Sequence, residues 1–274
     1  MTTVFDRSPL GRATDYPDRY DPALLFPIER AAQREAIGLS GALPFRGADL
    51  WTAYEISWLD ARGKPQLAIG RLAVPADSPA IVESKSLKLY LGSFAQERLP
   101  GIDTLERRIG DDLERVCEAA VHLELTPAAR FEELALEELP GESLDGLDVA
   151  LDAYEPAPEL LRSGGAETEE TLRSALFRSN CPVTGQPDYA DVMVRYHGPR
   201  VDRAGLLRYL VSYRKHAAFH ETCVERIFVE VLERCRPSAL TVNARFLRRG
   251  GIDINPFRSN FESASTATAR TPRQ

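Results

Sequence analysis

The chain has 274 residues, of which 43% are hydrophobic and 27% are charged, and its formal net charge is -7 at pH 7. These proportions are typical of a globular protein and argue against a disordered chain. The acidic balance argues against a surface that neutralises nucleic-acid phosphates, so we expect no direct binding of nucleic acid.

The sequence shows no clear signal for membrane insertion, for secretion or for a paired-cysteine motif. No apolar run approaches the roughly 20 residues of a membrane span, and residues 1–6 lack the basic and apolar regions of a secretory signal. The four cysteines, Cys117, Cys181, Cys223 and Cys235, contain no C-x-x-C pair, which favours reduced thiols over a zinc knuckle. We therefore expect a cytoplasmic protein that does not associate with membranes.

The first half of the chain predicts two strands followed by two helices. In chain order we expect an irregular arm over 1–45, strands over 51–59 and 66–74, a helix starting near residue 84 and a helix over 103–120. Gly63 and Pro65 lie between the strands, as in a hairpin turn. Leu105, Ile109 and Leu113 have helical spacing and define one apolar face of the second helix.

The second half predicts the same order of elements, with strands over 172–178 and 191–196 and helices near 203–215 and 221–235. Between the halves, residues 132–170 are acidic and contain Gly and Pro, as a linker would. The pattern predicts an α+β fold with antiparallel sheets and helices packed on one face. We expect an N-terminal arm (1–45), an N-terminal domain (46–160), a C-terminal domain (161–261) and a flexible tail (262–274).

Cys181 and Asp188 are the first candidates for chemistry. Cys181 follows a predicted strand and precedes Pro182, which favours an extended residue and then a turn that presents the thiol. Asp188 follows seven residues later, so the loop can bring a nucleophile and a proton source into one pocket. The alternatives are an inert buried thiol and a solvated turn carboxylate, and the other three cysteines, which lie on helical stripes, are expected to be inert.

A second group of candidates lies before and within the last strong helix. Glu221 is favoured there by the helix dipole, and with Glu83 it would grip the donor edge of a purine-like base, although it could also be a simple helix-start residue. His220 could hold a substrate or move a proton, or be a surface histidine spaced four residues from His216. His216, His220, Glu221 and Cys223 match no standard metal spacing, so we expect no metal.

The sequence contains no G-x-G-x-x-G fingerprint, so composition and motif alone predict no nicotinamide cofactor. Two places could receive phosphate. Ser84 and Lys85 stand at a predicted helix start, and Arg248 and Arg249 precede two glycines that allow close backbone approach. Both are also compatible with a solvated charged surface.

The stretches 20–27, 50–55, 83–90, 181–188 and 249–256 together resemble those of the QueF nitrile reductases. The resemblance covers most of the chain and implies two tandem tunnelling-fold (T-fold) domains and a homodimer. It implies NADPH-dependent reduction of the nitrile of 7-cyano-7-deazaguanine to 7-aminomethyl-7-deazaguanine through a cysteine thioimide, in queuosine biosynthesis for tRNA modification. The substrate is then a small deazapurine.

The resemblance also assigns roles to particular residues. Cys181 would be the nucleophile and Asp188 the proton donor, with His220 beside them. The implied substrate contacts are Val82, Glu83, Ser84, Phe219, His220 and Glu221, and the implied NADPH contacts are Ser84, Lys85, Arg249 and Gly250.

Two other functions are compatible with these residues. One is a metal-dependent pterin or purine hydrolase of the same fold, in which the glutamates bind the base and a metal-bound water attacks. The other is a binding or assembly protein in which Cys181 is incidental and reacts no faster than the other thiols.

Overall fold

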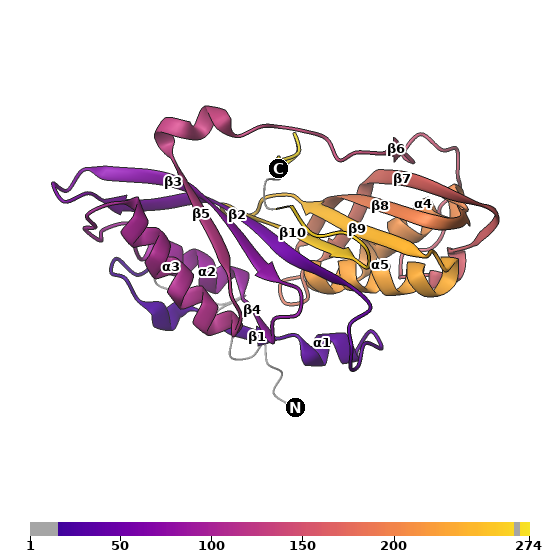
Figure 1. The fold of residues 1–274 in the computed structure, drawn as a ribbon, viewed down its shortest axis with the longest axis horizontal. Coiled ribbons are helices and arrows are strands. Elements are labelled where there is room, and N and C mark those ends of the chain that lie inside the picture. Colours follow the sequence, from indigo (N-terminus) through magenta and orange to yellow (C-terminus); the bar gives the residue numbers. More distant parts are fainter. Residues whose placement is uncertain (1–15, 266–268) are drawn as a thin grey trace. The chain divides into compact units, whose positions relative to one another are not determined.

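The computed structural model describes residues 16–265 and 269–274, and these form a mixed α+β fold (Figure 1). The helices are α1 (Ala31–Glu35), α2 (Ser84–Gly92), α3 (Ile102–Cys117), α4 (Arg203–Ser212) and α5 (His220–Cys235). The strands are β1 (Pro27–Glu29), β2 (Arg46–Leu59), β3 (Pro65–Pro75), β4 (Ala80–Val82), β5 (His122–Pro127), β6 (Glu142–Ser143), β7 (Ser163–Asn180), β8 (Pro187–Val201), β9 (Ala239–Phe246) and β10 (Ile252–Ser259). Short 3-10 helices cover Pro22–Leu24, Ala128–Glu133, Pro158–Leu160 and Tyr213–Lys215.

The chain forms two compact units. Unit 1 contains residues 1–40, 49–135 and 248–254, and unit 2 contains residues 41–48, 136–247 and 255–274. These limits differ from the linear division expected from the sequence, which placed a single boundary near residue 160. The reason is long-range pairing: the N–H of Tyr54 in β2 donates to the carbonyl of Gly251 at 2.9 Å, so the chain just before β10 joins unit 1.

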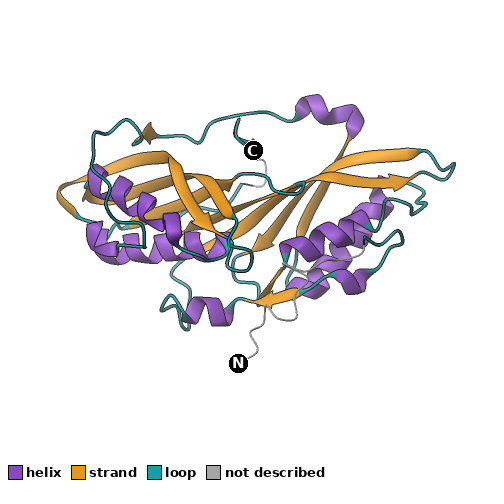
Figure 2. Ribbon diagram, turned by 180° about the vertical axis from the view of Figure 1, so that it is seen from behind, coloured by secondary structure: helices purple, strands orange, loops and turns teal. Residues whose placement is uncertain are grey.

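Unit 1 has the strand order β5-β3-β2-β10, and β3 pairs with β5 in antiparallel register from Ala68 opposite Pro127 to Ala73 opposite His122. The predicted β2–β3 hairpin is confirmed. The side chain of Asp60 accepts the N–H groups of Arg62 and Lys64, both at 2.9 Å, which stabilises the turn. Helices α2 and α3 lie together on one face of these strands (Figures 1 and 2).

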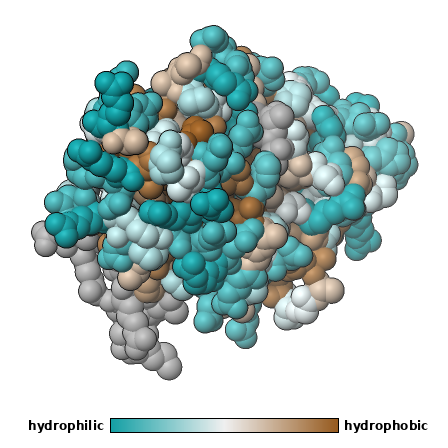
Figure 3. All heavy atoms as spheres, turned by 60° about the vertical axis from the view of Figure 1, so that its left-hand side comes forward, coloured by the Kyte–Doolittle hydropathy of each residue, from teal (hydrophilic) through white to brown (hydrophobic). Residues whose placement is uncertain are grey.

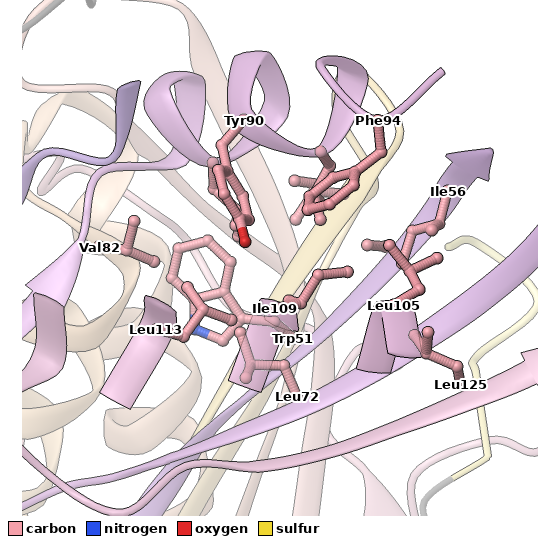
Figure 4. Close-up of a cluster of buried hydrophobic side chains, with 14 of the residues drawn as sticks. Trp51, Ile56, Leu72, Val82, Tyr90, Phe94, Leu105, Ile109, Leu113 and Leu125 are labelled. Atoms are coloured by element: carbon pink, nitrogen blue, oxygen red, sulfur yellow. The ribbon is translucent and has the colours of Figure 1, made fainter. Parts of the chain in front are cut away.

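The core of unit 1 fills the space between these helices and the strands. In Figure 4, Tyr90 of α2 and Phe94, just past the end of α2, point toward Trp51 and Leu72. The predicted apolar face of α3 is confirmed, because its residues Leu105, Ile109 and Leu113 are at most 1% exposed. Burying a side chain such as that of Phe94 stabilises the fold by about 1.5–3 kcal/mol.

The N-terminal arm is partly regular where the structure describes it. β1 pairs with β4, and the buried Arg30 forms an ion pair with Asp49 (2.5 Å). Tyr20 and Tyr90 both donate hydroxyl hydrogen bonds to the carboxylate of Asp112, at 2.6 and 2.7 Å. The arm is therefore anchored to unit 1 by charged and polar groups as well as by apolar packing.

Unit 2 has the strand order β10-β9-β8-β7-β6, and α4 and α5 lie on one face of it (Figure 2). The pairs β7–β8, β8–β9 and β9–β10 are antiparallel, and the two-residue strand β6 pairs with β7 in parallel. The predicted strands within β7 and β8 and both predicted helices are confirmed, although β7 and β8 extend well beyond the predicted limits. The order of two strands, two helices and further strands agrees with the predicted fold class.

The end of the chain differs from the flexible tail expected from the sequence. Arg273 forms an ion pair with Asp191 of β8 at 2.6 Å. The side-chain amide of Gln274 donates to the carbonyl of Phe246 at 2.9 Å and to Asn255 at 2.6 Å. Within the described residues, this end of the chain is therefore held against unit 2.

The surface drawn in Figure 3 is mostly hydrophilic, and apolar side chains are scattered among the polar ones. In the described part of the chain, no helix combines the length and the apolar character that crossing a membrane requires.

Candidate active site

Cys181 lies at the tip of the β7–β8 hairpin in unit 2. Asn180, the last residue of β7, pairs with Pro187, the first residue of β8, so the connection is the turn 181–186. The turn is closed by Cys181 N–H donating to the carbonyl of Gln186 at 2.9 Å, and by Gly185 N–H donating to the carbonyl of Cys181 at 3.0 Å. Gly185 has φ +68°, which a glycine adopts without strain. The sequence prediction of a turn after Cys181 is confirmed.

Asp188 lies on the same side of the hairpin as Cys181. It pairs with Ser179, and opposite residues of an antiparallel pair project to one face. Cys181 is two residues beyond Ser179, and residues two apart in an extended chain also share a face. Burial agrees with this register, because Ser179, Cys181 and Asp188 are all buried whereas Pro187 and Tyr189 are exposed.

His220 is the first residue of α5, and its ring is fixed from two sides. Its Nε2 lies 3.3 Å from Oδ2 of Asp188. The ring stacks on Phe246, the last residue of β9, with centroids 3.8 Å apart and planes 8° from parallel. His220 is therefore not the surface histidine that the sequence allowed. A proton on Nε2 would be donated to Asp188, and Nδ1 has no hydrogen-bond partner in the part of the chain that the structure describes.

Glu221 is buried in the first turn of α5, where the helix dipole favours a carboxylate. Phe219, at the N-cap position, makes no side-chain capping hydrogen bond. The end of α5 thus presents a carboxylate, an imidazole and an aromatic ring from three consecutive residues. Beside the Asp188–His220 pair, this arrangement can bind a polar heterocycle and hold or move a proton.

The other three cysteines differ from Cys181 in position. Cys117 ends α3, Cys223 lies within α5 and Cys235 ends it, and all three are 0% exposed. Burial raises the pKa of Cys117 to about 11, that of Cys223 to about 12 and that of Cys235 to about 11. These thiols stay protonated at neutral pH, in agreement with the inert role predicted for them.

The predicted substrate residues of unit 1 lie at the start of α2. Val82 belongs to the hydrophobic core, with 1% exposure. Glu83 caps the helix: its two carboxylate oxygens accept the N–H groups of Lys85 and Ser86, at 2.7 and 2.8 Å. The hydroxyl of Ser84 lies 3.4 Å from the same carboxylate. The start of α2 is thus stabilised by local hydrogen bonds.

A cavity of about 350 Å³ lies beside α2 within unit 1. Its lining includes two of the NADPH residues implied by the resemblance, Lys85 and Gly250, and three residues outside that implied set, Lys88, Glu55 and Gly251. Lys88 is three residues after Lys85, so both ammonium groups fall on one face of the helix. The spacing of the two lysines in the sequence could have indicated a phosphate site, but it also fits a solvated helix face.

The glycines bring backbone close to this cavity. A Cβ at Gly250 would lie 3.0 Å from Nζ of Lys88, and one at Gly251 would lie 2.5 Å from the carboxylate carbon of Glu55. Both glycines have positive φ, +58° and +78°. Lys85 and Lys88 supply positive charge, and the two glycines allow a ligand to come close to the backbone. Such a cavity suits the phosphates of a dinucleotide. The other two predicted NADPH residues, Ser84 and Arg249, are neighbours of these residues in the chain but do not line the cavity.

Comparisons with known proteins identify the family of the chain. The family model "Nitrile reductase, 7-cyano-7-deazaguanine-reductase N-term" matches residues 16–125, and the model "QueF-like protein" matches residues 187–265. A protein named NADPH-dependent 7-cyano-7-deazaguanine reductase from Bordetella pertussis is 58% identical over 97% of this chain and 98% of its own length. The chain belongs to the family of NADPH-dependent 7-cyano-7-deazaguanine reductases. A member from Burkholderia vietnamiensis is 55% identical over 98% of this chain and 99% of its own.

Among solved structures, "Crystal structure of the archaeosine synthase QueF-Like in the apo form" covers 36% of this chain and 97% of its own. Its TM-score is 0.31 and its identity is 17%, a likeness too weak to carry an argument about the fold.

Membership of the reductase family decides between the alternatives left open by the sequence. The comparisons give no support to a metal-dependent hydrolase. Among the described residues, no group of three or more His, Cys, Asp and Glu side chains is placed to hold a metal ion. Sequence reasoning missed Phe246, which stacks on the ring of His220. The two residues are 26 positions apart in the chain, and the strand end and the helix start meet only in the folded unit.

Proposed function

We propose that this protein reduces the nitrile of 7-cyano-7-deazaguanine to the amine of 7-aminomethyl-7-deazaguanine, using NADPH. The observation that carries the proposal is the Asp188–His220 pair on the face of the hairpin that also holds Cys181. Membership of the reductase family over nearly the whole chain supports the same substrate and cofactor.

The residues of unit 2 suit the first chemical step. A nitrile carbon accepts hydride poorly, so the thiolate of Cys181 adds to it and forms a C–S bond. The nitrile nitrogen takes a proton from Asp188, and the product is a neutral thioimide. His220, at 3.3 Å from the carboxylate, holds Asp188 in place and can return a proton to it. NADPH, when bound, supplies the hydrides that reduce this carbon.

Residues at the start of α5 bind the deazapurine in this proposal. The carboxylate of Glu221 accepts hydrogen bonds from the ring N–H and exocyclic amino group of the base, and Phe219 and His220 contact its ring. We keep Val82, Glu83 and Ser84 as proposed substrate contacts. Since Val82 is in the core, its contact would come from the backbone, and Glu83 would bind the base in addition to capping α2.

The cavity of unit 1 is the proposed site of the NADPH phosphates. Lys85 and Lys88 supply the positive charge, and the backbone at Gly250 allows close approach. Ser84 and Arg249 stay in the proposal as flanking contacts. We also propose a homodimer and a role in queuosine biosynthesis for tRNA modification, as the resemblance to the family implies. A cytoplasmic location is compatible with the four cysteines, because they form no disulfide among the described residues, as is typical of a reducing compartment.

The test uses purified wild type and Cys181→Ala with 7-cyano-7-deazaguanine. The wild type should oxidise NADPH, and without NADPH its intact mass should rise by the mass of the substrate. Both signals should disappear in Cys181→Ala and persist in Cys235→Ala, which removes a buried thiol from the end of α5. A wild type that neither consumes NADPH nor forms the adduct would refute the proposal.

A further inference from the structure

Asn180, the residue before Cys181, connects the tip of the hairpin to the segment that leads into α5. Its N–H donates to the carbonyl of His216 at 2.8 Å, and its carbonyl accepts the N–H of Ala218 at 3.2 Å. These bonds form a parallel bridge between Asn180 and Ala217. The main chain next to the thiol is thus tied to residues 216–218, two residues before His220.

The side chain of Asn180 adds a second pair of bonds. Nδ2 donates to the carbonyl of Arg214 at 3.2 Å, and Oδ1 accepts from the guanidinium of Arg178 at 3.2 Å. This orientation of the amide is the only one that fits, because a carbonyl can only accept and a guanidinium can only donate. An alanine would lose both bonds, and an aspartate would keep only the bond to Arg178.

The bonded segment leads into the proton-handling pair. Residues 214–218 run directly into Phe219 and His220, and His220 faces Asp188. Asn180 and Pro187 form the last pair of β7 and β8 before the turn, and Asp188 is the residue after Pro187. Asn180 therefore joins the two supports of the site, the hairpin that holds Cys181 and the helix start that holds His220.

We propose that Asn180 is a positioning residue for the addition step, setting the place of the Cys181 thiol relative to the Asp188–His220 pair. This inference rests on the proposed function. Asn180 does not touch the reacting atoms in this role: it restricts the hairpin tip so that the thiol and the proton source reach one nitrile together. Small displacements of reacting groups reduce rates strongly, by about 10²-fold for 1 Å.

The experiment measures the rate of adduct formation with NADPH withheld, together with kcat, KM and the thermal midpoint. Asn180→Ala should slow adduct formation and lower kcat by roughly 10- to 100-fold, with KM for the nitrile changed less than about threefold. Asn180→Asp has almost the same shape and should give a smaller loss, because it keeps the bond to Arg178. If Asn180→Ala folds poorly, Asn180→Asp alone tests the inference.

Asn260→Ala is the matched control within unit 2. The side chain of Asn260 also bridges backbone groups, accepting from Leu240 N–H at 2.8 Å and donating to the carbonyl of Ser238 at 3.5 Å. It should lower the thermal midpoint about as much as Asn180→Ala and leave adduct formation unchanged. A merely structural role of Asn180 predicts equal effects of both variants on the midpoint and on the adduct rate, and that result would overturn the inference.

The two proposals fail in different ways. If the wild type and Asn260→Ala form no adduct, the proposed function itself is wrong, and the role of Asn180 is lost with it. If they form it and both Asn180 variants form it at the wild-type rate, only the inference about Asn180 is wrong.

Discussion

The starts of α2 and α5 both carry a glutamate, but the structure uses the two carboxylates differently. Glu83 is the N-cap of α2, and both of its oxygens accept backbone N–H groups of the first turn. Glu221 lies inside the first turn of α5, whose N-cap residue Phe219 makes no side-chain cap. The two glutamates also lie at helices of different rank. Glu83 precedes the first helix after the β2–β3 hairpin of unit 1, whereas Glu221 belongs to the second helix after the β7–β8 hairpin of unit 2.

The comparison shows that a buried carboxylate at a helix start has two separable roles. Glu83 stabilises its own helix, so its removal should cost folding free energy. Glu221 adjoins His220 and through it Asp188, so its removal should cost binding. The following predictions test this division.

The largest effect is expected for Asp188→Asn. It tests whether the catalytic role of the start of α5 requires the carboxylate that β8 places beside His220. An amide cannot supply the proton that the nitrile nitrogen takes, so kcat should fall by roughly 10²–10⁴-fold. The control is Asp191→Asn, three residues along the same strand, which loses only an ion pair with Arg273. Steady-state NADPH oxidation measures both, and an Asp188→Asn variant with more than a tenth of wild-type kcat would exclude Asp188 as proton donor.

A smaller effect separates the two glutamates directly. Glu221→Gln should raise KM for the nitrile by roughly 10- to 100-fold, as expected when a charge-assisted hydrogen bond worth about 1.5–3 kcal/mol is lost. Glu83→Gln should lower the free energy of unfolding by about 0.5–2 kcal/mol, because the new amide NH₂ opposes a backbone N–H. Urea denaturation and steady-state kinetics on both variants give the four values. The comparison breaks if Glu221→Gln is the less stable variant and Glu83→Gln is the variant with the higher KM.

The smallest effect is expected for Trp51→Phe in the core beneath α2. The indole Nε1 of Trp51 is buried and, among the described residues, has no hydrogen-bond partner. Removing this N–H relieves an unsatisfied donor while some packing is lost, so the free energy of unfolding should change by less than about 1 kcal/mol. Urea denaturation measures it beside Glu83→Gln. A loss of several kcal/mol would mean that packing of the indole, rather than the cap, dominates this end of unit 1.

Much of the local structure followed from the sequence. The β2–β3 hairpin, the apolar face of α3 and the turn after Cys181 depend on residues close together in the chain, and their patterns predicted them. The resemblance to a reductase family likewise depends on short, ordered stretches, and the comparisons confirm it. The assignment of particular residues to substrate and NADPH stays a prediction.

What the sequence determined by itself was the position of each main helix and hairpin, because these depend on neighbours in the chain, and it also named the candidates for the reactive side chains. The tertiary structure alone decided that His220 stacks on Phe246 and that residues 248–254 join unit 1. These contacts require strand register and helix packing between segments far apart in sequence. No local periodicity encodes such distances, so only the folded chain could reveal them.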